Sequence, residues 1–460
     1  MATTRKLPPI ESTHAALASA LHQYTVPGQK LALGLSGGID SVSLLHALCH
    51  PDFSHYELCC VHVHHGLSPH ADAWADFCEA LCARFGLRLS IHRVVVDRDD
   101  PAGIEGAART ARQQVFAQLD VDVVLTAHHQ NDQAETLLLQ LLRGAGPKGL
   151  AAMAEWQPRS GWRAGQLRPW LQITRTQIAH YARAHGLAWI EDESNTDTAY
   201  SRNYLRHTLL PMLGRRFPSV VSTLARSAAL QAEANELLQD LAKLDAESCV
   251  TSDRLDCRCL AQLSLPRARN LLRWFIEQQG LRMPSERRLD EGLRQLLHAA
   301  SDARVSVMIH PGFELRRFQH GAYLVPMRAC TTQARVRWQG EPMLRLEYAG
   351  WEIAFHPMPG AGLSFCKLNA ARVELGVREG GERLRLEKNG VHHSLKNLLQ
   401  EARLPSWQRA CMPLLWCDGQ LVWVSGIGYN PDYLANSDEL GIVLASHAMP
   451  STTVGSGIIT

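Results

Sequence analysis

Residues 30–49 have the sequence KLALGLSGGIDSVSLLHALC, and this stretch indicates both the fold and the main site. Lys30–Leu35 is short and apolar, which predicts a buried strand, whereas Ser41–Cys49 places apolar residues at helical spacing. The loop SGGIDS joins the end of the strand to the start of the helix. Its two glycines allow positive φ angles and let backbone N–H groups approach an anion closely.

The SGGIDS loop is therefore predicted to bind phosphate. Its serine hydroxyls are further donors, and the helix that follows points the positive end of its dipole at the same place. An ordinary Gly-rich turn is the alternative, because the loop has neither the Walker lysine nor G-x-G-x-x-G. Asp40 is unusual beside phosphates unless a cation bridges it, so Mg²⁺ is predicted there. The predicted phosphate-binding residues are Ser36, Gly37, Gly38, Ile39, Asp40 and Ser41.

The first half of the chain alternates strand-like and helix-like segments. Further strands are predicted over 56–63, 87–96 and 121–127, and helices over 71–85, 105–119 and 133–143. Helices of this length between strands indicate an α/β fold with a parallel, doubly wound sheet. Such sheets bind ligands at the carboxyl ends of their strands, which is where the SGGIDS loop lies.

The pattern changes after residue 217. Helical periodicity dominates as far as residue 300, short strands follow over 305–327, and more short strands with one helix at 395–402 come after residue 335. We therefore expect an α/β catalytic domain over 1–217, a mainly helical domain over 218–330, a small α+β domain over 335–448 and a tail over 449–460.

Composition excludes several classes of protein. With 460 residues and a net charge of +2 the chain is no polycation, so a nucleic acid would have to bind at local basic patches. The absence of an apolar run of about 20 residues, and of a signal-peptide pattern, predicts a cytoplasmic protein with no membrane partner. The twelve cysteines include no C-x-x-C, so all are expected to be core or incidental thiols, without disulfides or zinc.

A second polar cluster, HHQNDQAET, occupies residues 128–136 after a predicted strand. Asp132 and Glu135 are three residues apart at the start of a helix, so both carboxylates lie on one face. They could hold Mg²⁺ or a substrate ammonium group, and acidic capping of the helix is the alternative. Because two strand-to-helix turns of one sheet converge here, Asp40, Asp132 and Glu135 are predicted to be catalytic.

Several arginines could neutralise phosphate or RNA. Arg109 and Arg112 lie three apart on the predicted helix 105–119, and Arg143 follows the next helix. All three are predicted to contact ATP, with a surface role as the alternative. Residues 159–183 and 200–217 combine arginines with aromatic residues and contain no acidic residue. That combination suits contacts with RNA phosphates and bases, and a structural lid over the sheet is the alternative.

S-G-G-x-D-S resembles the pyrophosphatase loop (PP-loop) of enzymes that cleave ATP between its α and β phosphates, whose fold is adenine nucleotide alpha hydrolase-like. Within that group the chain resembles the bacterial tRNA(Ile)-lysidine synthetase family over nearly its whole length. One departure is Asn131, because the family pattern H-H-x-D-D-Q-x-E-T has aspartate there. Matching blocks include VHVHHGLSPHADAW (61–74), EGAARTARQQVF (105–116), LTAHHQNDQAETLLLQLLRGAGPKGL (125–150) and SLKNLLQEARLPSWQRACMPLLW (394–416).

The resemblance implies ATP with Mg²⁺, free L-lysine and the tRNA(Ile) whose anticodon is CAU. In the implied reaction the wobble cytidine is adenylated at its C2 oxygen, and lysine then displaces AMP to give lysidine, which changes codon reading from AUG to AUA. Asp132 and Glu135 would bind the lysine, and a homodimer is left open. The implied tRNA-binding residues are Arg202, Asn203, Arg206, Lys396 and Arg409.

Two other functions remain open. A tRNA thiolation enzyme would share the loop, but enzymes of that kind usually carry C-x-x-C or a cysteine pair, for which only Cys49 and Cys59 are candidates here. A nucleotide-binding regulator without chemistry is the other alternative. The intact carboxylates Asp40, Asp132 and Glu135 argue against the regulator.

Overall fold

The computed structural model describes residues 9–101, 103–159, 161–299, 305–327, 335–388 and 390–449. Cys330 and nearly all of the predicted tail 449–460 lie outside the described residues. The chain forms two compact units, one ending at Asp240 and the other beginning at Leu241. Within the described ranges, no helix is long and apolar enough to cross a membrane.

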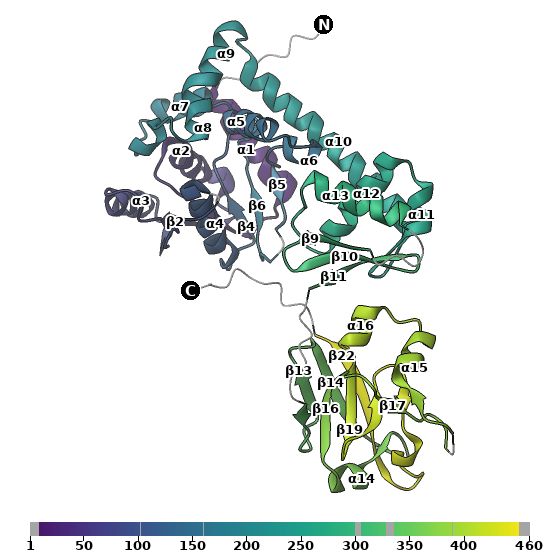
Figure 1. The fold of residues 1–460 in the computed structure, drawn as a ribbon. Coiled ribbons are helices and arrows are strands. Elements are labelled where there is room, and N and C mark those ends of the chain that lie inside the picture. Colours follow the sequence, from purple (N-terminus) through teal and green to yellow (C-terminus); the bar gives the residue numbers. More distant parts are fainter. Residues whose placement is uncertain are drawn as a thin grey trace. The chain divides into compact units, whose positions relative to one another are not determined.

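A six-stranded sheet with the order β3-β2-β1-β4-β6-β5 forms the centre of the first unit (Figure 1). All its neighbouring strands pair in parallel except β5, which is antiparallel to β6. The strands are β1 (Lys30–Gly34), β2 (Glu57–His64), β3 (Arg88–Arg93), β4 (Val123–Leu125), β5 (Trp156–Gln157) and β6 (Gly165–Leu167). The helices are α1 (Pro9–Tyr24), α2 (Ile39–Leu48), α3 (Ala71–Arg84), α4 (Gly103–Ala117), α5 (Gln130–Leu142), α6 (Pro147–Leu150) and α7 (Arg175–Ala184), with short turns η1 (Pro51–Phe53) and η2 (Glu193–Thr196).

Both faces of this sheet are covered, as the predicted doubly wound fold requires. Successive residues of a strand point to opposite faces. Leu31 and Leu33 of β1 pack in one core with α1, α2 and α7, while Ala32 packs in a second core with Val115 and Phe116 of α4. The near-continuous apolar sequence of β1 follows from burial on both sides. The predicted α/β fold class is confirmed.

The arginine-rich stretch 159–183 is partly structural: the prediction of an RNA surface is wrong for its buried residues, whereas Arg163, Arg175 and Arg183 are exposed. Trp170 and Tyr181 are buried in the core. Arg168 is 1% exposed, and its guanidinium donates to the Ala154 carbonyl and to the side chains of Gln157 and Gln166. A buried arginine whose terminal nitrogens donate to neutral acceptors cannot be distinguished by composition from an exposed one.

A long helical segment begins in the first unit and ends after its last residue, Asp240. It comprises α8 (Ser201–Tyr204), a wide π turn η3 (Leu205–Leu209), α9 (Leu210–Arg216) and α10 (Val220–Cys249). Pro211 lies in the first turn of α9 and has no backbone N–H. A proline ring also clashes with the carbonyl four residues earlier, so the wider turn before Pro211 relieves that contact.

The first part of the second unit combines helices with a sheet of order β7-β8-β11-β10-β9. The hairpin of β7 and β8 interrupts what the sequence predicts to be continuous helix, and it pairs with β11, far along the chain. Ser285 is the N-cap of α13. The elements are β7 (Val250–Thr251), β8 (Arg254–Asp256), α11 (Cys257–Gln262), α12 (Leu265–Gln278), α13 (Glu286–His298), β9 (Ser306–His310), β10 (Phe313–Phe318) and β11 (Gly321–Pro326).

The prediction that every cysteine is a free thiol is wrong for two of them. Cys249 and Cys259 form a disulfide across the β7–β8 hairpin, whereas the sequence predicts free thiols throughout. The hairpin turns the chain back on itself and so brings together two residues that a continuous helix would hold apart. Nine other cysteines in the described ranges are free.

The rest of the second unit is rich in short strands around its own cores. Two larger sheets have the orders β12-β16-β19-β20-β21 and β13-β14-β22-β15, and the predicted helix at 395–402 is α15 (Leu395–Glu401). The other elements are β12 (Val336–Arg337), β13 (Met343–Leu346), β14 (Trp351–Pro359), β15 (Leu363–Ser364), α14 (Phe365–Ala370), β16 (Val373–Val377), β17 (Arg383–Leu384), β18 (His393–Ser394), α16 (Ser406–Ala410), β19 (Pro413–Cys417), β20 (Gln420–Val424), β21 (Gly428–Tyr429), η4 (Pro431–Tyr433) and β22 (Leu440–Ala448).

Candidate active site

The SGGIDS loop is held in shape by its own two serines. The Ser36 and Ser41 hydroxyl oxygens are 3.1 Å apart, the Ser36 N–H donates to the Ser41 hydroxyl at 3.2 Å, and the Ser41 hydroxyl donates to the Gly38 carbonyl at 3.0 Å. Gly38 is the N-cap of α2 and has no side chain to cap the helix. The first N–H groups of α2 are therefore available to an anion, as the sequence predicts.

Gly37 fits the loop only because it has no side chain. Its φ is +83°, and a Cβ atom would lie 2.5 Å from Ile190 Cδ1 and 3.3 Å from Cys78 Sγ. The Ile190 N–H donates to the Gly37 carbonyl at 2.9 Å, so the segment after α7 packs directly on the loop. The amino-acid sequence alone gives no sign of this contact with Ile190.

Gly37→Ala is expected to reduce ATP affinity at least tenfold and to destabilise the first unit. A left-handed conformation costs a non-glycine residue about 1–2 kcal/mol, and displacing Ile190 adds to this. Gly28→Ala is the matched control, since Gly28 has φ +86° but nothing within 4 Å of its missing Cβ. Nucleotide titration and thermal melting of both variants measure the difference. Equal effects of the two substitutions would show that the contact with Ile190 does not shape the loop.

Asp40 has an environment that fits a cation ligand. Its Oδ1 is buried and has no hydrogen-bond partner among the described residues, while its Oδ2 lies 3.6 Å from His129 Nε2. A buried carboxylate oxygen without a partner is costly, and a divalent cation with oxygen ligands would satisfy it. The residues present therefore fit Mg²⁺ beside the loop.

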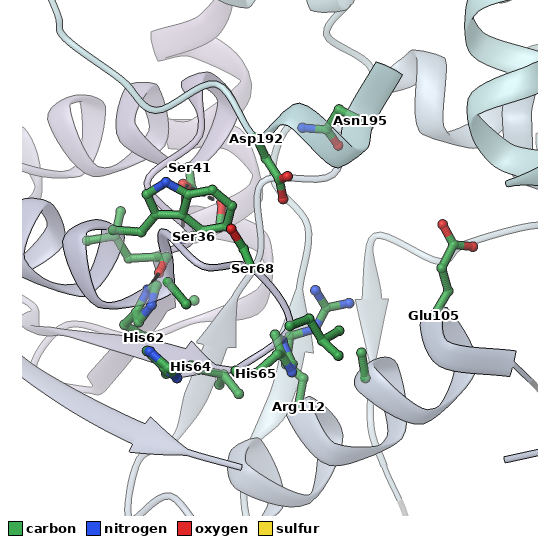
Figure 2. Close-up of a pocket in the computed structure, with 18 of the residues that line it drawn as sticks. Ser36, Ser41, His62, His64, His65, Ser68, Glu105, Arg112, Asp192 and Asn195 are labelled. Carbon is green, nitrogen blue, oxygen red and sulfur yellow. Dashed lines mark hydrogen bonds between the residues drawn. The ribbon is translucent and has the colours of Figure 1, made fainter. Parts of the chain in front are cut away.

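A cavity of about 760 Å³ opens beside the SGGIDS loop (Figure 2). Its walls come from the loop, the end of β2, α4 and the segment 192–203. This volume lies within the range of about 300–1,000 Å³ that is typical of ligand sites. Ser36 and Ser41 lie on one wall and Arg112 on another, so a nucleotide bound here could reach both.

Two side chains of the cavity have polar groups that no described residue pairs with. His65 Nδ1 is buried without a hydrogen bond, and burial, with a smaller effect of Arg112, lowers the pKa of His65 to about 4. Burial lowers the pKa of Arg112 to about 10, so its guanidinium stays charged, and no acidic side chain in the described ranges is paired with it. A neutral imidazole and an unpaired cation suit a base and a phosphate group respectively.

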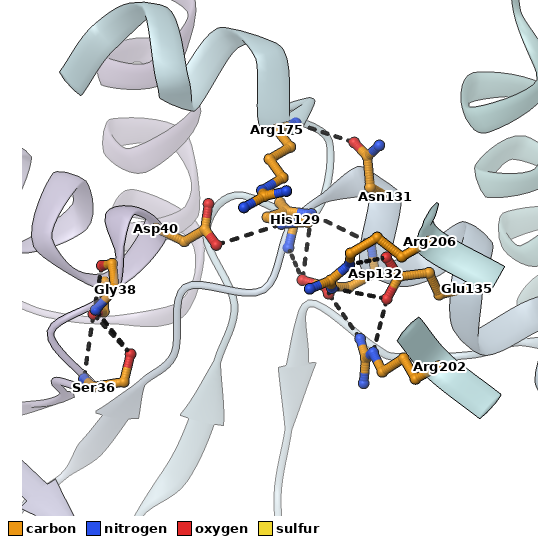
Figure 3. A network of polar contacts seen from close by, with 11 residues as sticks. Ser36, Gly38, Asp40, His129, Asn131, Asp132, Glu135, Arg175, Arg202 and Arg206 are labelled. Atoms are coloured by element: carbon orange, nitrogen blue, oxygen red, sulfur yellow. Dashed lines mark hydrogen bonds and ion pairs between the residues drawn. The ribbon is translucent and has the colours of Figure 1, made fainter. Parts of the chain in front are cut away.

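Four charged side chains form a closed network beside this cavity (Figure 3). Arg202 donates to Glu135 Oε2 and to Asp132 Oδ1, both at 2.7 Å. Arg206 donates to Glu135 Oε1 at 2.7 Å and Oε2 at 3.0 Å, and to Asp132 Oδ1 at 3.2 Å. Two carboxylates and two guanidiniums make the quartet neutral. The sequence places these carboxylates on one helix face, but it does not reveal their arginine partners.

His129 joins the quartet to Asp40. Its Nδ1 lies 3.3 Å from Asp132 Oδ2, and its backbone N–H donates to the same oxygen at 3.0 Å. Burial disfavours the charged imidazole, but Asp132 and Asp40 outweigh it, so the pKa of His129 is raised. Burial likewise opposes ionisation of Asp132, but the charges of His129 and Arg202 hold its pKa well below the usual range. The N-terminus of α5 is thus a capped helix end and a charged site at once.

The remaining predicted residues lie in different places. Asn203 is buried, lines the cavity and donates to the Asp197 carbonyl at 2.9 Å. Asn131 accepts the Arg175 N–H at 3.0 Å. Arg143 is the exposed C-cap of α5 and Arg109 is exposed on α4; neither lines the cavity. In the second unit, Lys396 is exposed on α15, and the Arg409 guanidinium donates to the Leu404 carbonyl.

Comparison with known families covers most of the chain. Residues 11–213 match the PP-loop domain, residues 255–323 the TilS substrate binding domain, and residues 373–445 the TilS substrate C-terminal domain.

Similar proteins match over almost their full length. A protein named tRNA(Ile)-lysidine synthase from Nitrosomonas europaea is 40% identical over 97% of this chain and 98% of its own. Proteins of the same name from Azoarcus sp. and Aromatoleum aromaticum are 42% and 41% identical, each over 91% of this chain and over 92% and 97% of their own lengths. The similarity thus spans both compact units.

Proposed function

The chain belongs to the tRNA(Ile)-lysidine synthase family, an ATP-using ligase family, and we propose that it joins free L-lysine to C2 of the wobble cytidine of tRNA(Ile) with the anticodon CAU. The sequence-based prediction of this family is confirmed. The proposed reaction forms an adenylated cytidine, releases pyrophosphate, and then releases AMP when lysine attacks.

One observation gives the main support for two adjacent subsites, one for the nucleotide and one for lysine. His129 lies between Asp40 of the phosphate loop and Asp132 of the acidic pair, 3.6 Å and 3.3 Å from their carboxylate oxygens. A nucleotide held by the loop and an amine held by the acidic pair would therefore be separated by little more than the His129 imidazole ring. Two reactants held at neighbouring positions need no further bimolecular encounter.

In the first step the C2 oxygen of cytidine attacks the α-phosphate, and pyrophosphate leaves. The N–H groups at the start of α2 and the hydroxyls of Ser36 and Ser41 would hold the leaving pyrophosphate. Arg112, charged and unpaired among the described residues, would contact phosphate from another wall of the cavity. A Mg²⁺ ion at Asp40 would offset the negative charge of the phosphates.

In the second step the lysine ε-amine forms a bond to C2, the bond from C2 to the adenylated oxygen breaks, and AMP leaves with that oxygen. The amine must first lose a proton, which costs about 5 kcal/mol at pH 7 for an amine whose reference pKa is about 10.4. Asp132 and Glu135 are our candidates for this step, one fixing the α-ammonium group of lysine and the other accepting the proton or binding a metal ion.

The quartet links two predicted roles, lysine binding by the acidic pair and tRNA binding by the two arginines. As long as Arg202 and Arg206 neutralise Asp132 and Glu135, the acidic pair has little attraction for the lysine cation. A tRNA phosphate that drew one arginine away would leave a net negative charge at the acidic pair. We therefore propose that tRNA binding at Arg202 or Arg206 prepares the lysine subsite.

Nothing in the cavity favours the thiolation alternative. No described cysteine lines the cavity. Burial raises the pKa of Cys49 to about 11 and also raises that of Cys59, so neither thiol is activated as a nucleophile.

Labelled lysine is expected to enter a tRNA(Ile) transcript with the anticodon CAU when ATP and Mg²⁺ are present. Pyrophosphate release should need the transcript but not lysine, because adenylation comes first. Mass analysis of the anticodon nucleoside would identify the product, and a thiolation product would contain sulfur and no lysine. The lysine dissociation constant should also fall when the transcript is bound, because Arg202 or Arg206 would then be drawn away.

The matched control is the same transcript with uridine at the wobble position. If labelled lysine never enters the CAU transcript under these conditions, the proposed function is wrong. If lysine enters but binds equally well with and without tRNA, only the proposed role of the arginine exchange is wrong.

A further inference from the structure

Three side chains of the kinds that bind metal ions lie close together in the first unit, outside the proposed active site. His14 comes from α1, His50 precedes η1, and Asp52 lies within η1. One nitrogen or oxygen atom from each lies within 4.8 Å of the other two. None of the three lines the cavity beside the SGGIDS loop.

The distances in this cluster fit a metal ion. Asp52 Oδ2 is 3.1 Å from His14 Nε2 and 3.3 Å from His50 Nδ1. Zinc binds nitrogen and oxygen at about 2.0–2.1 Å with tetrahedral geometry, which separates ligand atoms by about 3.3 Å. Both distances therefore match an edge of such a tetrahedron.

The hydrogen-bonding roles of the two imidazoles also point to a cation. His50 Nδ1 accepts the Asp52 N–H at 3.3 Å, so it carries a lone pair, and that lone pair also faces the Asp52 carboxylate. His14 Nε2 is buried and makes no hydrogen bond to any described residue, although the same carboxylate oxygen is nearby. The His50 lone pair and the Asp52 carboxylate are both acceptors and repel each other, and a cation between them removes that repulsion.

We propose that His14, His50 and Asp52 bind a divalent transition-metal ion, with Zn²⁺ as the ion that suits two imidazoles and one carboxylate. Water completes the fourth position, because the side chains of His50 and Asp52 are 50% and 57% exposed. The ion links α1 to the segment between α2 and β2. The site is structural, since it lies apart from the nucleotide cavity and would stabilise the fold by binding only the folded state.

Equilibrium dialysis of the full chain against Zn²⁺ alone, followed by metal analysis, tests this site. We expect a binding step of one Zn²⁺ per chain that is weakened at least tenfold in both His14→Ala and His50→Ala. Zn²⁺ should raise the melting temperature of the unmodified protein but not of these variants. His22→Ala is the matched control, because His22 is exposed on the same helix and lies outside the cluster.

Two further measurements keep the interpretation clear. Co²⁺ in place of Zn²⁺ should show no sulfur-to-metal charge-transfer band, which excludes the free cysteines as ligands. Asp52→Asn, which keeps the side-chain shape, should also weaken binding. Zn²⁺ binding that is unchanged in His14→Ala and His50→Ala, or reduced equally in His22→Ala, would overturn the proposal, as would a thiolate band with Co²⁺. None of these outcomes depends on lysine incorporation.

Discussion

Asp40→Asn is expected to lower ATP-dependent pyrophosphate release on the order of 10³-fold while leaving tRNA affinity within about twofold. A metal ion at a phosphoryl group is worth several kcal/mol in the transition state, and each 1.36 kcal/mol is about a tenfold change in rate. Asparagine keeps the shape of the side chain but removes the charge that would hold the cation. Oδ1 has no described partner to lose, so the fold should tolerate the change.

The measurement is pyrophosphate release as a function of Mg²⁺ concentration, together with tRNA binding and thermal melting. Asp76→Asn is the control, because Asp76 is an exposed carboxylate on α3 of the same unit. A variant that retains full activity at an unchanged Mg²⁺ requirement would remove Asp40 from the proposed mechanism. Loss of tRNA binding or a large fall in melting temperature would instead assign Asp40 a structural role. The substitution would then act through the 3.6 Å contact between Asp40 and His129.

The sequence predicted the strands and helices between residues 30 and 143 well because their signals are local. Strands such as 30–35 are apolar on both faces, and the amphipathic period of 105–119 identifies α4. The donors of the SGGIDS loop are recognisable from the sequence, since its glycines, serines and helix start are consecutive. Local patterns of this kind determine strand and helix positions and the carboxyl edge of a parallel sheet.

The side chains that pair with the site residues could not be predicted in the same way. Arg202 and Asp132 are 70 residues apart, and no periodicity reports that a guanidinium will reach a particular carboxylate. The hairpin β7–β8 is short and polar, so its pairing with β11, more than 60 residues later, leaves no local pattern. For the same reason the sequence did not bring Cys249 and Cys259 together, or His14 and Asp52. Long-range contacts depend on how the elements pack.

Glu135→Gln is expected to destabilise the first unit by roughly 3 kcal/mol and to raise the lysine KM much more than the ATP KM. Glu135 is 1% exposed and accepts three hydrogen bonds from Arg202 and Arg206. A glutamine amide group would direct N–H donors at guanidinium donors and leave positive charge uncompensated. Removing one partner of a buried ion pair typically costs about 3–5 kcal/mol, and 3 kcal/mol lowers the melting temperature of a domain of this size by roughly 10 °C.

Stability and lysine binding must be separated, so the kinetics should be measured well below the melting temperature of the variant. Glu79→Gln, an exposed change on α3, controls for the loss of one acidic residue. The double variant Glu135→Gln/Arg202→Gln should lose less stability than the sum of its single changes, because the unpaired guanidinium is removed with the carboxylate. Strictly additive losses would show that the two side chains are not energetically coupled. If the double variant recovers stability while the lysine KM stays high, Glu135 acts on lysine directly rather than only through the fold. If lysine KM recovers together with stability, the carboxylate serves only to position the arginines.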